Sequence, residues 1–159
     1  MTPILELRKV TKSYRGINAV TDVDFSLHAG EIHSIVGENG AGKSTLTKII
    51  AGAVTGYEGD MLVDGKPARF ETPKDALNTG IVMVYQENSL VPALTVAQNI
   101  FLGRERFFNR MRGINIAAQQ LIQSFNFDVD PTAMVSSLGA AKKQMVEIAR
   151  AVSQKARIV

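Results

Sequence analysis

A glycine-rich stretch in the first third of the chain carries the clearest chemical signal. Residues 37–44 read Gly-Glu-Asn-Gly-Ala-Gly-Lys-Ser and fill every fixed position of the pattern G-x-x-x-x-G-K-[ST]. Glycines in such a loop let successive backbone N–H groups turn inward around phosphate oxygens. Lys43 adds a full positive charge for the outer phosphates, and the Ser44 hydroxyl is a ligand for Mg²⁺. The stretch predicts a binding site for a nucleoside triphosphate and its metal.

The elements expected around this loop favour the same prediction. Residues 31–36 predict a strand that runs directly into the loop. The residues after it show apolar side chains at i, i+3, i+4 and i+7, which predicts a helix; these are Leu46, Ile49, Ile50 and Ala53. Gly52 and Gly56 are candidate ends for that helix. A helix beginning near Lys43 directs its positive dipole end at a bound anion. The alternative is a glycine-rich turn with a surface lysine and no ligand. The predicted strand before the loop and the predicted amphipathic helix after it favour the binding site over this alternative.

The rest of the chain alternates between strand and helix patterns. Strands are expected at 4–10, 23–27 and 81–85, a hairpin at 61–63 and 68–70 around Asp64-Gly65, and a short helix after a Thr72 cap with Pro73. Helices are expected at 95–102, 115–125 and 140–153, followed by the beginning of a strand at 156–159. This order predicts an α/β nucleotide-binding core with a small β region and a helical subdomain.

Composition excludes several classes of protein. The 159 residues are 45% hydrophobic and 21% charged, as in ordinary globular domains, and they include no cysteine and only two histidines, His28 and His33. A disulfide scaffold and a thiolate or histidine-rich metal site are therefore excluded. No apolar run approaches the ~20 residues that span a bilayer, and no secretory signal is expected. The net charge of +3 is too small to predict nucleic-acid binding.

Several short motifs occur in an order that resembles the ATP-binding subunit of ABC importers, most closely the monosaccharide (ribose, galactose or xylose) branch. They are 12–14 (Lys-Ser-Tyr), 30–33 (Gly-Glu-Ile-His), 37–46, 84–87 (Val-Tyr-Gln-Glu), 94–105 and 144–150 (Gln-Met-Val-Glu-Ile-Ala-Arg). The resemblance covers nearly all of the chain. It implies a P-loop NTPase (RecA-like) core with a small antiparallel β subdomain and a helical subdomain, in the first of two ATP-binding halves.

Within that resemblance the chain is expected to be the N-terminal part of one nucleotide-binding domain, incomplete before the Walker B motif. The expected divisions are 1–88 for the β subdomain and P-loop core, 89–153 for the helical subdomain, and 154–159 for the start of the next core strand. The Mg²⁺-binding Asp, the catalytic Glu and the switch His of the family have no counterpart in these residues. Because phosphoryl transfer depends on placing metal, water and charge, hydrolysis by this chain alone should be negligible.

The resemblance also assigns roles to individual residues, with ATP and Mg²⁺ as the ligands. The expected nucleotide-binding residues are Tyr14, Gly37, Glu38, Asn39, Gly40, Ala41, Gly42, Lys43, Ser44 and Thr45. Tyr14 matches the aromatic residue that stacks on adenine, although the residues alone favour a tyrosine at a strand edge. Gln86 matches the glutamine that, with Ser44, contacts the metal and orients the attacking water. By position alone it would be a surface loop glutamine.

The second nucleotide contact of the family departs from its pattern here. Registering on residues 144–150 places Leu138, Gly139, Ala140, Ala141 and Lys142 where the family has Leu-Ser-x-Gly-Gln. Losing the serine hydroxyl removes a hydrogen bond typically worth ~1.5–3 kcal/mol, and the Cβ of Ala141 obstructs a close approach. A register shifted by two residues would restore Ser137 and Gly139 but disagrees with the helix that follows. One interpretation is that Lys142 replaces part of the lost phosphate contact. We prefer the other, that this signature no longer contacts nucleotide.

The expected function is the ATP-binding component of an ABC-type sugar importer, coupling ATP binding and hydrolysis to transport. Expected partners are a second nucleotide-binding domain arranged head to tail, transmembrane permease subunits that dock on residues 88–104, and indirectly a periplasmic or extracellular sugar-binding protein. The expected location is the cytoplasmic face of the membrane, peripherally bound. Nucleic acid is not expected as a partner.

A basic cluster is interpreted as a solvated face or as a contact near membrane headgroups. It consists of Arg104, Arg106, Arg110 and Arg112. The alternatives are a non-catalytic nucleotide-binding module and a soluble ABC protein outside transport; a simple P-loop kinase is weaker.

Overall fold

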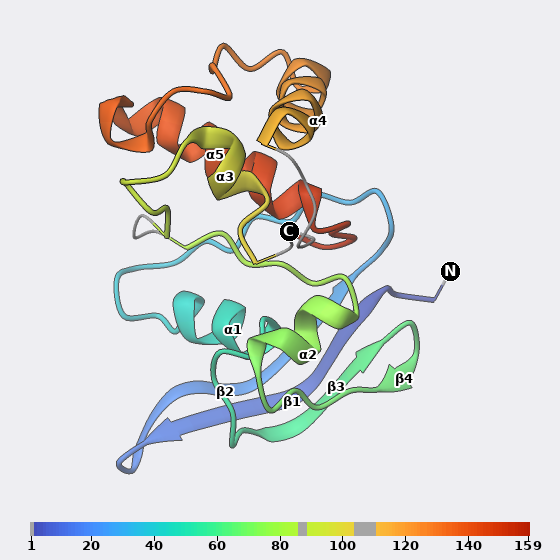
Figure 1. Cartoon of the computed structure of the whole chain (residues 1–159). Helices are drawn as coiled ribbons and strands as arrows, with labels where there is room; N and C mark the ends of the chain where they lie inside the picture. Colours follow the sequence, from blue (N-terminus) through green and yellow to red (C-terminus); the bar gives the residue numbers. More distant parts are fainter. Residues whose placement is uncertain (1, 86–88, 104–110) are drawn as a thin grey trace. The chain divides into compact units, whose positions relative to one another are not determined.

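The computed structural model describes residues 2–85, 89–103 and 111–159 (Figure 1). The chain divides into two compact units, Met1–Ile81 and Val82–Val159, and each is described by itself. Gln86 and three of the four clustered arginines, at 104, 106 and 110, lie outside the described residues.

The first unit contains a four-stranded antiparallel sheet in the order β2-β1-β3-β4. Its strands are β1 (Leu5–Tyr14), β2 (Ile17–Leu27), β3 (Glu58–Val63) and β4 (Lys66–Pro67). Leu5 and Leu7 are buried because alternate side chains of a strand point to the same face. The strands predicted at 4–10 and 23–27 are confirmed but longer, and the hairpin around Asp64-Gly65 is confirmed with a second strand that is shorter and earlier than 68–70.

Two helices complete the first unit. Helix α1 (Lys43–Ile50) buries Leu46, Ile49 and Ile50 of the predicted stripe, whereas Ala53, its fourth predicted member, lies beyond the end of the helix and is exposed. Helix α2 (Pro73–Asn78) begins with a capping box, in which the Thr72 backbone N–H donates to Asp75 Oδ2 at 2.9 Å. Both predicted helices are confirmed, and α1 ends next to Gly52, whose φ is 67°.

The strand predicted at 31–36 is wrong. These residues form no strand, and Ile32 and Val36 are 96% and 89% exposed. An extended segment becomes a strand only when a neighbour satisfies its N–H and C=O groups, and no described strand pairs with this segment. Residues 31–36 therefore lead into the loop without pairing with a described strand.

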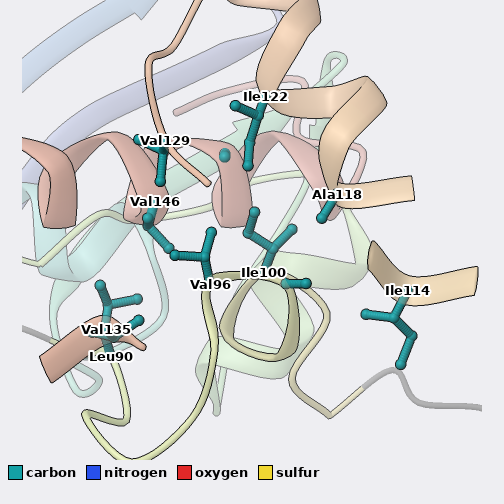
Figure 2. Packing of buried hydrophobic residues seen from close by; sticks show 11 residues of the cluster. Leu90, Val96, Ile100, Ile114, Ala118, Ile122, Val129, Val135 and Val146 are labelled. Atoms are coloured by element: carbon teal, nitrogen blue, oxygen red, sulfur yellow. The ribbon is translucent and has the colours of Figure 1, made fainter. Parts of the chain in front are cut away.

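The second unit is helical. It contains α3 (Val96–Ile100), α4 (Met111–Ser124), a 3₁₀ turn (Val135–Ser137) and α5 (Ala140–Ser153). Buried side chains from these helices point toward one another, with Val96 and Ile100 of α3 facing α4 and α5 (Figure 2). The predicted helices are confirmed: α5 has the predicted bounds, whereas α4 begins four residues earlier than the predicted 115.

The two strands predicted in the second unit are not formed as ladders. In place of strands at 81–85 and 156–159, the Val82 N–H donates to the carbonyl of Ile158 at 2.9 Å. Ile81 is buried, but Tyr85 and Val159 are 39% and 68% exposed. Strand pairing could not be predicted from these apolar runs, because pairing depends on which distant segments lie alongside. Within the described ranges, no helix is long and apolar enough to cross a membrane.

Candidate functional site

The loop of residues 37–42 is held against strand β2 at its last residue. Gly42 is the N-cap of α1 with φ 84°, and a Cβ at this position would lie 2.1 Å from the carbonyl oxygen of Ala19. Gly40 also has a left-handed backbone, with φ 91°. Gly37 instead is restricted by space, because a Cβ there would lie 3.2 Å from Cβ of Ala41. The conformation of the loop therefore depends on glycine at more than one position.

The Lys43 side chain folds back over the loop. Its ammonium group donates to the carbonyl oxygens of Gly37 and Glu38, both at 2.7 Å. The positive charge is therefore held at the mouth of the loop by backbone dipoles rather than by an acidic side chain. Carbonyl partners are weaker competitors for an ammonium group than a carboxylate, so this lysine is available to a phosphate.

The start of α1 has donors that no side chain satisfies. The first turn of a helix has N–H groups without intrahelical partners, and the N-cap Gly42 provides no side-chain acceptor. The first turn also has no acidic residue. The first helix hydrogen bond runs from the Leu46 N–H to the carbonyl of Gly42 at 2.9 Å. The N–H groups before this bond are therefore available to bind an anion, as at other helix N-termini that bind phosphate.

Ser44 and Thr45 lie in this first turn. Ser44 is exposed, and its hydroxyl makes no hydrogen bond among the described residues, while Thr45 is half-buried. A free hydroxyl beside a lysine and a helix N-terminus fits the donor set for a phosphate-bound Mg²⁺. The structure thus brings together the predicted residues 37–45. A role for each of them in nucleotide binding remains a prediction.

Tyr14 lies at the end of β1, where it pairs with Ile17. Its side chain is 46% exposed, and the Lys12 ammonium lies 5.1 Å from the ring centroid. Lys12 also donates to the carbonyl oxygens of Thr55 and Gly56. The position is that of a strand-edge tyrosine, the alternative to adenine stacking, and stacking stays a prediction.

The degenerate signature lies at the start of α5. Gly139 is the N-cap, with φ −69° and ψ 163° and no side-chain cap. Lys142 forms an ion pair with Asp128 at 3.1 Å. Ser137, the serine of the shifted register, donates its hydroxyl to the carbonyl of Met134 at 2.8 Å. Both candidate phosphate contacts therefore have local partners within the helical unit.

Sequence reasoning missed a group of polar side chains inside the helical unit. Glu147 is 7% exposed and accepts hydrogen bonds from the Ser89 backbone N–H at 2.9 Å and from its hydroxyl at 3.2 Å. Arg150, one turn further along α5, donates to the carbonyl of Ser89 at 3.1 Å. The sequence feature that could have indicated this buried group is Glu147 itself, a charged residue next to Val146 on the apolar face of a predicted helix.

Asn99 is a second buried polar residue that the sequence analysis did not identify. It is fully buried in α3, its Oδ1 accepts from the Val91 N–H at 2.7 Å, and its Nδ2 donates to the carbonyls of Val91 and Thr95 at 3.0 Å. Together with Glu147, it fixes the segment 89–95, while Val91 itself stays exposed.

The histidines do not form a metal centre. His28 Nδ1 and His33 Nε2 lie 3.3 and 3.0 Å from the same carboxylate oxygen of Glu31. The His28 backbone N–H donates to this oxygen and is the main cause of a pKa of Glu31 below its ordinary value of 4.5. Within the described part of the chain, no group of three histidine or acidic side chains could hold a metal ion. The His28 side chain is half-buried, whereas His33 is exposed.

Comparisons with known proteins agree with this geometry. Residues 20–159 match the family model described as ABC transporter. The chain is 48% identical to "Ribose import ATP-binding protein RbsA 1" of Rubrobacter xylanophilus, over 100% of this chain and 32% of that protein. It is 45% identical to "Putative ribose/galactose/methyl galactoside import ATP-binding protein 1" of Burkholderia ambifaria, over 98% of this chain and 31% of that protein. The chain thus spans about a third of the length of these curated relatives.

Solved structures show the fold. A crystal structure of the ADP conformation of MJ1267, an ATP-binding cassette of an ABC transporter, superposes with a TM-score of 0.85 at 22% identity, covering 98% of this chain and 66% of that one. A nucleotide-free ATP-binding cassette from an ABC transporter superposes with a TM-score of 0.82 at 22% identity, covering 97% and 66%. The fold is that of the ATP-binding cassette, a P-loop NTPase fold with an antiparallel β subdomain, and the predicted fold class is confirmed.

Proposed function

We propose that this chain, which belongs to the ABC transporter family, is the ATP-binding part of a sugar import system. The observation that carries this proposal is the loop of residues 37–42 with the Lys43 ammonium at its mouth and the uncapped start of α1 behind it. Curated relatives named as ribose import ATP-binding proteins support sugar as the class of cargo.

The residues of the loop fit ATP with Mg²⁺. The N–H groups at the start of α1 would bind phosphate oxygens, Lys43 would neutralise the outer phosphates, and the Ser44 hydroxyl would ligate the metal. When bound, the metal neutralises charge that develops on the phosphates. Tyr14 is proposed to stack on the base, and Gln86 to contact the metal.

The 159-residue chain is proposed to bind nucleotide without efficient hydrolysis of its own. Hydrolysis needs the attacking water to be placed and polarised, and Gln86, the residue that the resemblance assigns to orienting the water, carries an uncharged amide that is no general base. In the whole system a second nucleotide-binding domain would bind head to tail. Permease subunits would dock on the helical unit, at the cytoplasmic face of a membrane. The sugar-binding protein would act through the permease.

A second candidate function is a non-catalytic nucleotide-binding module. Gly139 and Ala141 favour it, because the N-cap of α5 has no hydroxyl and the first turn of α5 has Ala141 in place of the expected glycine. In that case the loop would still bind ATP, but α5 would contribute nothing to a partner's nucleotide. A soluble ABC protein outside transport has less support, since the relatives over the whole chain are import proteins by name.

Equilibrium unfolding with and without Mg-ATP tests the shared claim. Ligand at about 100 times its dissociation constant should raise the free energy of unfolding by about 2.7 kcal/mol. Lys43→Ala should abolish this increase because the variant removes the charge at the loop mouth. Lys48→Ala, an exposed lysine in the last turn of the same helix, is the matched control and should keep it.

The results separate the two parts of the proposal. No increase with the wild-type chain, under conditions where it unfolds cooperatively, would contradict nucleotide binding. An equal loss in Lys43→Ala and Lys48→Ala would show that helix charge, not the loop, is responsible. Steady phosphate release by the purified chain that is lost in Lys43→Ala would contradict the proposal that it binds without efficient hydrolysis.

A further inference from the structure

The tip of the loop contains a reactive dipeptide. Asn39 is the one asparagine in the sequence that is followed by glycine. Both residues are exposed, and they occupy the middle of a turn in which the Ala41 N–H donates to the carbonyl of Glu38 at 3.2 Å. Gly40 has φ 91°, a left-handed backbone that favours glycine at this position of the turn.

The groups that would react with each other have no other partners. Among the described residues, neither the Asn39 side-chain amide nor the Gly40 backbone N–H makes a hydrogen bond. The surroundings are open as well, because a Cβ built on Gly40 would meet no atom within 4 Å. The Asn99 side chain is the opposite case, since it is fully buried and bonded at both ends of its amide.

We propose that Asn39 is a site of spontaneous deamidation. The Gly40 nitrogen attacks the Asn39 side-chain carbonyl carbon. A new C–N bond forms, the bond to the amide nitrogen breaks, and ammonia leaves with the proton of the Gly40 N–H. Water then opens the cyclic imide at one of its two carbonyls and gives aspartate or isoaspartate. No oxidant, reductant or other co-reactant is needed, and glycine favours the attack because it has no side chain to obstruct it.

The product would oppose anion binding by the loop, a consequence that rests on the proposed function. Either product places a carboxylate next to backbone donors and Lys43, where it competes with phosphate for the same groups. Isoaspartate also adds a carbon to the main chain and changes the spacing of the loop N–H groups. Deamidation at this position is therefore a chemical route to permanent loss of nucleotide binding.

Peptide mapping by mass spectrometry tests the modification without reference to nucleotide. The 159-residue chain is incubated at neutral pH and 37 °C and sampled over days. Conversion of a side-chain amide to an acid raises the mass of its peptide by about 1 Da. The peptide that contains Asn39 should gain this mass before any other asparagine peptide, with isoaspartate as one product. Asn39→Gln is the matched control and should stay unmodified. Earlier reaction at another asparagine, or an unmodified Asn39, would overturn the proposal.

A second arm tests the consequence for binding. Asn39→Asp should bind Mg-ATP about tenfold more weakly than wild type, and Asn78→Asp, which adds the same charge on exposed α2, should not. Mg-ATP during the incubation should slow deamidation of Asn39. Wild-type-like affinity of Asn39→Asp would overturn the predicted consequence. Failure of the wild type to bind ATP would refute the proposed function instead, and the mapping result alone would then decide the modification site.

Discussion

At the scale of single residues, buried polar side chains decide where the chain runs in the helical unit. Asn99 and Glu147 are the two polar or charged residues among the buried ones described, and each bonds backbone groups of the segment 89–95. A buried polar group is costly unless it is paired, so these residues specify one path for the segment rather than adding much net stability.

Replacing Asn99 should therefore be severe. Asn99→Ala leaves the Val91 N–H without its partner, removes the hydrogen bonds that the amide donates to the carbonyls of Val91 and Thr95, and opens a small cavity, so the free energy of unfolding should fall by about 2–4 kcal/mol. Chemical denaturation measures this loss. Asn78→Ala, at an exposed position of α2, is the comparison and should change stability by less than about 0.5 kcal/mol. Similar losses in the two variants would show that the Asn99 hydrogen bonds do not fix the segment.

At the scale of elements, the loop depends on how closely α1 approaches β2. Gly42 begins the helix where the backbone of Ala19 leaves no room for a side chain. Amphipathic spacing predicted α1 from the sequence because that pattern is local. The same reasoning could not predict the unpaired segment 31–36, because strand pairing depends on distant partners, nor the contact of Gly42 with β2.

Adding a methyl group at Gly42 tests this contact. Gly42→Ala combines a left-handed backbone with a Cβ placed 2.1 Å from a carbonyl oxygen, so the free energy of unfolding should fall by about 2–4 kcal/mol. Gly113→Ala is the matched control: it lies inside α4 with open space around it and should stabilise by about 0.5–1 kcal/mol. A neutral Gly42→Ala would contradict the close packing of α1 on β2.

The cap of α2 predicts a dependence of stability on pH. Hydrogen bonds from the Thr72 hydroxyl and backbone N–H hold the pKa of Asp75 below its ordinary value of 3.8. The native state thus binds the proton more weakly than the unfolded state. The contribution of Asp75 is present above pH 3.8 and disappears as the pH falls through the lower native value. The stability difference between wild type and Asp75→Asn should shrink over that range. A difference independent of pH would contradict the capping role.

At the scale of the whole molecule, much of the fold and of the candidate site could be predicted from the sequence. The loop, its following helix and the helical second half are encoded in local patterns and short motifs, and the family comparisons confirm the fold class. Residues such as Glu147 and Asn99 could not be predicted, because their roles depend on partners brought together only by folding. Functions of Tyr14, Gln86 and residues 138–142 depend on nucleotide and on other chains, and they remain predictions.

The central claim is that backbone N–H groups of residues 37–45 hold the phosphates of ATP. Amide hydrogen exchange of the 159-residue chain with and without Mg-ATP measures this directly, residue by residue. We expect Mg-ATP to slow exchange mainly at residues 40–45 of the wild-type chain and to leave exchange of these residues unchanged in Lys43→Ala. Unchanged exchange in this loop at a nucleotide concentration that stabilises the protein would place the nucleotide elsewhere and contradict phosphate binding by these N–H groups.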